Sequence, residues 1–260
     1  MRTAEQPGEG TARARAWQHA AQAAVCDVIR PWAHGTVVRA TRYPGYFDCN
    51  VVRVEDDVPM DFEELASFAD EALAGLAHRR VDFELPQPAE RLRRRFERAG
   101  WLTMRLLWMR QEEGALAASG QPGDVAEVPY DAVADLRVAW QREDFPDQDA
   151  SGHRAEAREV ALRRDARVFA ASERGVPVGF AQLERVGSAA EITQVYMDPD
   201  HRGRRLGSAV TAAAIRAAGD AEDLWICADD EGRPKRMYAR LGFRPAWRSM
   251  QFLRLPRRGA

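Results

Sequence analysis

The stretch VYMDPDHRGRRLGSAV, residues 195 to 210, decides the fold. An apolar run ends at an Asp-Pro turn, arginines and glycines follow, and an alanine-rich segment with helical periodicity comes next. This order indicates a strand, a short loop and a helix. The first N–H groups of a helix lack intrahelical acceptors and carry positive potential, so such a junction suits an anion. The residues alone leave two interpretations open: a phosphate or carboxylate binder, and a solvated basic turn that caps the helix.

The elements around this stretch predict an α+β fold with a mixed, mostly antiparallel sheet flanked by helices. Two helices should come first, then a hairpin with Arg174-Gly175 at its turn. A strand, a helix ending at Gly219, a strand, a short helix and a last strand should follow. The ranges are 131–142, 153–165, 167–186, 190–198, 205–219, 223–229, 234–242 and 248–255.

The first half of the chain is mixed α/β as well. Two strand-like runs separated by a Pro-Gly turn come first, followed by an amphipathic helix, a strand, a second helix and a strand. These elements are expected within residues 35–56, 61–80, 81–85, 88–100 and 101–110. We place domain boundaries at residues 1–112 and 127–260, with residues 113–126 as a Gly- and Pro-rich linker.

The two halves share a local pattern. RRRFERAGW (residues 93–101) and PKRMYARLGF (residues 234–243) both place an aromatic residue four positions before a Gly-aromatic pair. Superposing Gly100 on Gly242 sets Phe96 opposite Tyr238. A helix followed by a C-terminal glycine and an aromatic strand start is a common sequence, so chance remains an alternative to duplication.

Composition narrows the class of protein. The 260 residues are 45% hydrophobic and 30% charged, with a net charge of −2, which is typical of a globular protein. Three separated cysteines, Cys26, Cys49 and Cys227, favour a reduced compartment over a disulfide scaffold. No run approaches the roughly 20 apolar residues of a membrane span, so we expect a cytoplasmic protein. The histidines show no ligand spacing, and no metal is expected.

With residues 195–210 and the elements around them, the second half of the chain resembles the GCN5-related N-acetyltransferase (GNAT) superfamily. That family's signature is Arg/Gln-x-x-Gly-x-Gly/Ala between its fourth strand and third helix, and residues 202–207 match it except at Arg205. MYARLGFRP, about thirty residues later, resembles the family's second signature, Tyr followed by Gly-Phe. The resemblance covers residues 125–256 and implies a GNAT fold, with the first half as a degenerate second copy in tandem.

The resemblance implies a site for acetyl-CoA. In this superfamily the fourth and fifth strands splay apart, and main-chain groups of the fourth strand hold the pantetheine arm. An Asn or Asp at the end of the fifth strand assists; here either Asp229 or Asp230 holds that place, or caps the next turn. Carried over, the coenzyme-binding residues are Val195, Tyr196, Met197, Arg202, Gly203, Arg204, Arg205, Leu206, Gly207, Ser208 and Asp229.

Arg205 stands where the family usually has its first glycine. One alternative is that its side chain crowds the pyrophosphate and weakens coenzyme binding. The other is that the position has helical φ, tolerates a Cβ, and lets the guanidinium swing out to meet the 3′-phosphate. Because Arg202 and Gly207 are kept, we favour a functional loop.

The chemistry asks for a proton acceptor and a proton donor. Tyr238 matches the family's acid, which protonates the leaving thiolate; the alternative is a core aromatic with a solvated hydroxyl. Glu191, at the start of the fourth strand, is the candidate base; otherwise it is a solvated residue, and Glu184 is a weaker candidate. Four acidic residues in 142–153 form a loop that either attracts a cationic acceptor or is simply exposed.

The first half lacks the signature, and its acidic EDDVPMDFEE, residues 55–64, is hostile to phosphate. We therefore expect one working copy: an acetyl-CoA-dependent N-acetyltransferase acting on a primary amine of a small molecule, with Tyr238 as acid. Two alternatives are a non-catalytic acyl-CoA-binding module and a transferase that uses an aminoacyl-tRNA donor. The near-neutral charge speaks against a nucleic-acid partner. A monomer or homodimer without membrane contact is expected.

Overall fold

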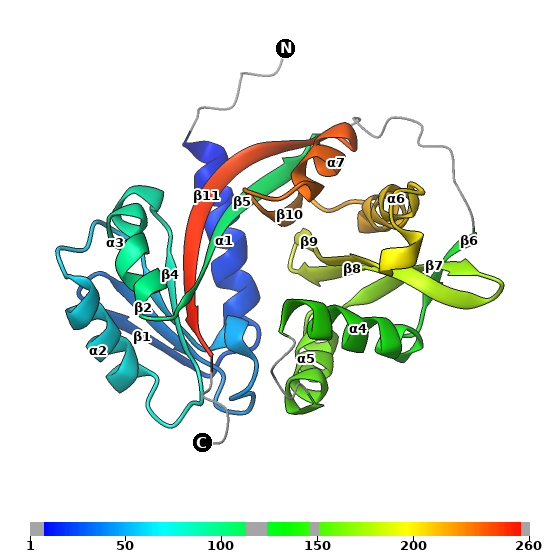
Figure 1. The fold of residues 1–260 in the computed structure, drawn as a ribbon. Helices are drawn as coiled ribbons and strands as arrows, with labels where there is room; N and C mark the ends of the chain where they lie inside the picture. Colours follow the sequence, from blue (N-terminus) through cyan, green and yellow to red (C-terminus); the bar gives the residue numbers. More distant parts are fainter. Residues whose placement is uncertain (1–7, 113–123, 146–150, 256–260) are drawn as a thin grey trace, which may run out of the picture. The chain divides into compact units, whose positions relative to one another are not determined.

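The computed structural model describes residues 8–112, 124–145 and 151–255 (Figure 1). By their contacts these residues form two compact units. Unit 1 runs as far as Trp108 and also includes Asp229–Glu231 and the chain from Ala246. Unit 2 runs from Met109 to Ala228 and also includes Gly232–Pro245. The units therefore differ from the expected division at residues 112 and 127, because the last part of the chain packs with unit 1.

Unit 1 contains the predicted strands and helices of the first half and begins with two elements that were not predicted, α1 and β1. Its elements in chain order are α1 (Glu9–Ala23), β1 (Val28–Trp32), β2 (Gly35–Arg39), the 3-10 helix η1 (Phe47–Cys49), β3 (Val51–Val54), α2 (Phe62–Ala72), β4 (Arg79–Phe83), α3 (Pro86–Arg98) and β5 (Leu102–Gln111). β5 continues past Trp108 into unit 2.

The sheet of unit 1 is completed by the last strand of the chain. β1, β2 and β3 pair antiparallel, and β3 pairs parallel with β4. β11 (Phe243–Arg254) then pairs antiparallel with β4, with Met250 opposite Phe83. Phe252 of β11 is fully buried and stacks on Phe96 of α3 at 4.0 Å between ring centroids. Burial of these rings explains why β11 packs with unit 1 from Ala246 onward.

Unit 2 has the element order expected for the second half, with one further strand. Residues 113–123 of the expected linker lie outside the described residues, while residues 124–126 belong to this strand, β6. The elements are β6 (Asp124–Val128), η2 (Tyr130–Val133), α4 (Ala134–Asp144), α5 (Ser151–Arg163), β7 (Arg167–Glu173), β8 (Val176–Val186), β9 (Ala189–Met197), η3 (Pro199–His201), α6 (Leu206–Ala218), β10 (Asp223–Asp229) and α7 (Pro234–Arg240).

The sheet of unit 2 is antiparallel from β6 to β9 and ends in the parallel pair of β9 and β10. The β7–β8 hairpin turns at Arg174 and Gly175, whose φ angles of 52° and 80° are those of the expected tight turn. α6 covers one face of β7, β8 and β9, and α4 and α5 cover the other (Figure 1). Each face of the sheet therefore has its own helical layer.

The two units repeat one order of elements. Unit 1 has a helix, three antiparallel strands, a helix, a strand, a helix and a strand. After β6 and two helices, the chain of unit 2 has three antiparallel strands, a helix, a strand and a helix, and β11 follows. In each unit the last of these three antiparallel strands pairs parallel with the strand after the next helix, β3 with β4 and β9 with β10. α3 and α7 are both followed by a glycine with positive φ, Gly100 at 78° and Gly242 at 94°. This agreement is what a duplicated fold predicts.

Candidate functional site

The parallel pair of β9 and β10 diverges along its length. Its register spans four residue pairs, from Ala189 opposite Asp223 to Ile192 opposite Ile226. Beyond Ile192, β9 continues against β8 as far as Met197. Within the described residues, no part of β10 pairs with β9 beyond Ile192. The last part of β9 therefore keeps one main-chain edge that β10 does not cover.

A β-bulge lies where the two strands part. Gln182 of β8 is opposite Gln194, whereas the next residue, Leu183, is opposite Ile192, so Thr193 is the extra residue. Bulges re-aim the residues that follow them. On β8, Gly179 lies opposite Met197, and a Cβ there would come within 1.7 Å of the Met197 methyl group. Gly179 thus makes room for the Met197 side chain.

The loop between β9 and α6 has the backbone of an anion site. Gly203 has φ 78° and Arg205, immediately before the helix, has φ 63° and ψ 5°. No side chain caps the helix N-terminus. The first N–H groups of α6, those of Leu206, Gly207 and Ser208, therefore lack a side-chain acceptor and carry the positive end of the helix dipole. This arrangement suits a phosphate group.

The expectation of an ordinary helical φ at Arg205 is wrong, because the residue adopts the left-handed backbone conformation. That conformation favours glycine and costs an L-residue roughly 1–2 kcal/mol. Arg205 therefore keeps the backbone that a glycine would adopt while adding an exposed side chain.

Gly207 of α6 lies close to side chains of both β9 and α7. A Cβ on Gly207 would meet the Met237 sulfur at 3.4 Å and the Met197 Cγ at 3.6 Å. Met197 ends β9, and Met237 belongs to α7 beside Tyr238. The first turn of α6 is therefore packed against both the open strand and the helix that carries the candidate acid.

Two of the three loop arginines are already paired with carboxylates. Arg202 donates to both oxygens of Glu143 on α4, at 2.8 and 2.7 Å, and its Nε donates to the main-chain oxygen of Met197 at 3.1 Å. Arg204 donates to Glu173 at 2.7 Å. The side chain of Arg205 makes no hydrogen bond or ion pair with any described residue. The guanidinium most available to a bound anion is therefore that of Arg205.

His201 joins the same network from η3. Its ring nitrogens lie 3.0 Å from Asp198 and 3.0 Å from Glu173. Hydrogen bonds to Asp198 and then to Glu173 raise the pKa of His201. Arg204 and then His201 lower the pKa of Glu173 to about 2. The loop thus contains a group, His201, whose charge changes above pH 6.5.

Tyr238 is buried on α7. Its ring packs edge-on against Phe243, at 6.3 Å between centroids. Burial, with a smaller contribution from the Cys227 thiol, raises the pKa of the Tyr238 hydroxyl. Cys227 follows Ile226, the last residue of β10 that pairs with β9. A phenol with a raised pKa is a proton donor, not a base, at neutral pH.

The two candidate bases lie side by side on neighbouring strands. Glu191 of β9 is opposite Glu184 of β8, and both are buried. Glu184 forms an ion pair with the buried Arg164 at 3.2 Å and accepts a hydrogen bond from Gln182 at 2.7 Å. An ion pair and a hydrogen bond therefore hold the Glu184 carboxylate in place.

Asp229 and Asp230 have local partners. Asp229 accepts a hydrogen bond from the main-chain N–H of Glu231 at 2.9 Å, which is the turn-capping alternative. Asp230 pairs with Arg248 at 2.9 Å. Both residues are grouped with unit 1, whereas every other candidate site residue belongs to unit 2.

Unit 1 lacks the features of this site at the equivalent place. β3 and β4 stay paired to their ends, from Val52 opposite Val81 to Val54 opposite Phe83, and the Glu84 N–H then donates to the Val54 oxygen at 2.9 Å. α2 begins with a capping box in which the Asp61 carboxylate accepts from an N–H of the first turn. A phosphate would meet this carboxylate instead of free N–H groups.

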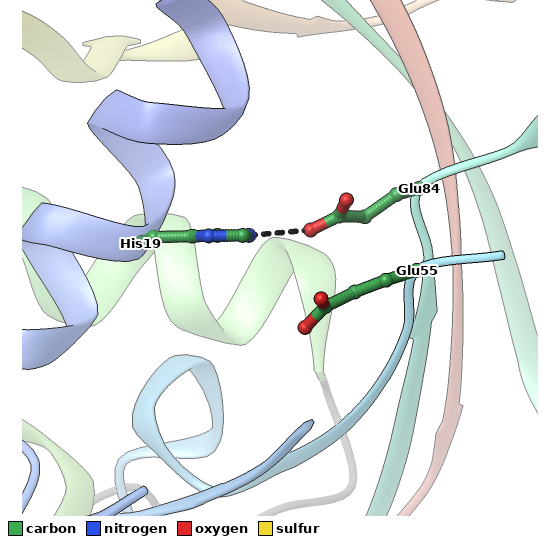
Figure 2. A group of neighbouring side chains, drawn as sticks. All are labelled: His19, Glu55 and Glu84. Atoms are coloured by element: carbon green, nitrogen blue, oxygen red, sulfur yellow. Dashed lines mark hydrogen bonds and ion pairs between the residues drawn. The ribbon is translucent and has the colours of Figure 1, made fainter. Parts of the chain in front are cut away.

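Unit 1 does contain a cluster that sequence spacing did not predict. His19 of α1 points toward Glu84 after β4, with Glu55 after β3 beside them (Figure 2), and their ligand atoms lie within 4.8 Å of one another. Geometry alone would allow a metal ion. However, Arg15 pairs with Glu84, and the Nε of Arg53 lies 2.8 Å from Glu55 and 3.6 Å from Glu84. Two guanidinium groups already balance both carboxylates, which favours an ionic network that ties α1 to the strand ends.

No helix among the described residues is both long enough and apolar enough to cross a membrane.

Comparison with known proteins supports the fold and the family. Residues 130–243 match the acetyltransferase (GNAT) family model. A functionally unknown protein from Staphylococcus epidermidis ATCC 12228 is similar in structure, with a TM-score of 0.68, 16% identity, and coverage of 89% of this chain and 95% of that chain. The comparison with curated proteins found no match.

Two further solved structures carry the family name. A GCN5-related N-acetyltransferase from Kribbella flavida has a TM-score of 0.58 and 20% identity, with 96% of each chain covered. One from Sphaerobacter thermophilus has a TM-score of 0.54 and 17% identity, covering 87% of this chain and 79% of that chain. At this identity the likeness shows the fold alone. Residues 130–243 therefore match the acetyltransferase (GNAT) family model, and the solved structures show the same fold.

Proposed function

We propose that unit 2 is an acetyl-CoA-dependent N-acetyltransferase that transfers an acetyl group to a primary amine of a small molecule. One observation carries the proposal. The open edge of β9 leads directly into a loop with positive φ at Gly203 and Arg205, and from there into an uncapped helix N-terminus. An extended ligand with a phosphate at one end fits that sequence of features.

We assign the coenzyme contacts to the following groups. The N–H groups of Leu206, Gly207 and Ser208 would bind the pyrophosphate. The main chain from Val195 to Met197 would bind the pantetheine arm along the open edge of β9. Arg205 would add a charge-assisted contact to a phosphate, because its guanidinium has no other described partner. Of these groups, the Met197 oxygen already accepts from Arg202.

Bound acetyl-CoA would supply an activated thioester. The protein's contribution is then mainly to position the acceptor nitrogen at the thioester carbonyl. As the C–N bond forms and the C–S bond breaks, Glu191 would accept the proton that leaves the amine. Tyr238 would donate a proton to the departing thiolate, and its raised pKa keeps the hydroxyl protonated until then.

Unit 1 is proposed as the silent copy. Its β3–β4 pair stays closed and its α2 N-terminus is capped by Asp61, so both features that carry the proposal in unit 2 are missing there. It provides strand β4 and the Phe96 ring, against which β11 packs.

The proposal is tested by following thiol release from acetyl-CoA with a panel of primary amines, each compared with its N,N-dimethyl analogue. Amine-dependent thiol release that the tertiary analogues do not support is the expected result. No release with any amine, although acetyl-CoA binds, would favour the second candidate, a non-catalytic acyl-CoA-binding module. Arg205, a non-glycine residue in a left-handed conformation within the loop, is the observation that favours this second candidate.

A further inference from the structure

A cavity lies in unit 2 on the face of β9 that α4 and α5 cover. Its volume is about 90 Å³. It is lined by three aromatic side chains, three charged or titratable side chains, two amides and one alanine: Tyr130, Trp140, Phe145, Arg137, Asp144, His153, Gln141, Gln194 and Ala157.

The cavity reaches β9 close to the proposed reaction centre. Gln194 lines it and stands between the bulged Thr193 and Val195. Val195 is the first residue of the main chain that we assign to the pantetheine arm. The opposite face of this strand carries Met197 against α6. A molecule in the cavity would therefore approach β9 from the side opposite to α6.

The end of the cavity at the C-terminal part of α4 contains hydrogen-bond acceptors. The Gln141 side-chain oxygen is buried, and no described donor reaches it. Asp144 lies exposed at the rim, where it accepts a hydrogen bond from Trp140. Partial burial of its carboxyl and then the charge of Glu143 raise the pKa of Asp144, while Arg202 acts in the opposite direction. A carboxylate in this position is stabilised when a cation binds beside it.

The other end of the cavity contains a guanidinium group. Arg137 is buried on the same helix, and its guanidinium lies over the rings of Tyr130 at 3.9 Å and Phe180 at 4.6 Å. It donates to the side-chain oxygens of Gln182 and Gln194. Seven residues separate Arg137 from Asp144, about 10 Å along the helix axis. A cation is therefore favoured at the Asp144 end and disfavoured at the Arg137 end.

We propose that this cavity is the acceptor site and that it takes an organic ammonium with an aromatic or apolar body. The ammonium lies against Trp140, donating to Asp144 and to the Gln141 oxygen, where a cation–π contact adds to the ion pair. The body fills the space lined by Tyr130, Phe145 and Ala157. Binding is a property of the cavity itself, but its role as the acceptor site rests on the proposed acetyltransferase function.

The test is an isothermal titration of phenethylamine into the full-length protein, with 2-phenylethanol as the matched neutral probe. We expect phenethylamine to bind at least tenfold more tightly than the alcohol. Asp144→Asn should reduce phenethylamine affinity by tenfold or more without changing that of the alcohol. Asp135→Asn is the control, because Asp135 is an exposed residue of α4 that does not line the cavity.

Equal affinities for the two probes, no binding of phenethylamine, or an unchanged affinity in Asp144→Asn would overturn the proposal. Trp140→Leu gives a second variant that removes the aromatic face and the donor to Asp144, and it should weaken phenethylamine binding as well. A parallel titration with acetyl-CoA separates the two proposals. Acetyl-CoA binding without phenethylamine binding defeats only the acceptor site, whereas loss of acetyl-CoA binding defeats the acetyltransferase function.

Discussion

Arg202 holds Glu143 through both oxygens of its carboxylate, at 2.8 and 2.7 Å from the same guanidinium nitrogen. Glu143 lies in the last turn of α4 on one side of the sheet, and Arg202 precedes α6. The hydrogen bond from Arg202 lowers the pKa of Glu143, so the carboxylate is charged at neutral pH. A phosphate at the loop must therefore compete with Glu143 for this arginine.

Glu143→Gln should strengthen acetyl-CoA binding. Removing the charge frees Arg202 to face the phosphate, and we expect a three- to tenfold gain in affinity at low salt, on the order of 1 kcal/mol. Because the pair is exposed, the free energy of unfolding should change by less than about 1 kcal/mol. The control is Glu127→Gln, which breaks the exposed pair of Glu127 with Arg167 away from the loop. Unchanged affinity in Glu143→Gln would remove Arg202 from the phosphate site.

Arg205→Gly separates backbone strain from side-chain contact. Glycine adopts the observed φ of 63° without a Cβ penalty, so the free energy of unfolding should rise by about 1 kcal/mol in chemical denaturation. Acetyl-CoA affinity should nevertheless fall several-fold, because a guanidinium available to the phosphate is lost. Arg204→Gly, at a position without positive φ, should bring no gain in stability. Tighter coenzyme binding in Arg205→Gly would mean that the side chain crowds the site.

Tyr238→Phe should lower turnover by tenfold or more and leave acetyl-CoA affinity nearly unchanged. The expected loss follows from removing a general acid, whose contribution is typically about 100- to 10,000-fold. Steady-state kinetics with an active amine, together with a coenzyme titration, make the measurement. Tyr46→Phe removes a hydroxyl from a buried tyrosine of unit 1 and should keep full activity. Equal turnover in Tyr238→Phe would exclude this residue as the acid.

The pKa of His201 should lie above 6.5 in the folded protein. Asp198 contributes most and Glu173 next, so Asp198→Asn should lower this pKa more than Glu173→Gln does. A raised histidine pKa stabilises the fold fully below the unfolded value near 6.5, and this contribution is lost as pH rises through the folded value. Titration of the histidine ring signals by NMR, with His201→Gln to assign the signal, makes the measurement. An unshifted pKa in the wild type would contradict the network.

Much of the fold follows from local sequence signals. The helix that ends at Gly219, the tight turn at Arg174-Gly175 and the strand at 223–229 all lie where glycine position and apolar runs predicted them. These signals act over a few residues, so the sequence displays them directly. The strand-loop-helix order at residues 195–210 is of the same kind.

The packing partners of β11 could not be predicted from local sequence. Its apolar pattern predicts a strand, but no neighbouring residue in the sequence indicates that Phe252 stacks on Phe96 in unit 1. The partners of Arg202 and Arg204 were missed for the same reason, since Glu143 and Glu173 are distant in sequence. Arg205 shows a third limit: an arginine gives no sign of left-handed φ, whereas the glycine usual in the family would have indicated it.

The most direct test of the central claim is an isothermal titration of acetyl-CoA into the intact protein, which gives affinity and stoichiometry together. We predict one site per chain, because among the described residues only those of unit 2 combine an open strand edge with an uncapped helix N-terminus. Two sites per chain would show that unit 1 also binds the coenzyme, against the closed β3–β4 pair and the capping box at Asp61. No binding would contradict the coenzyme site itself.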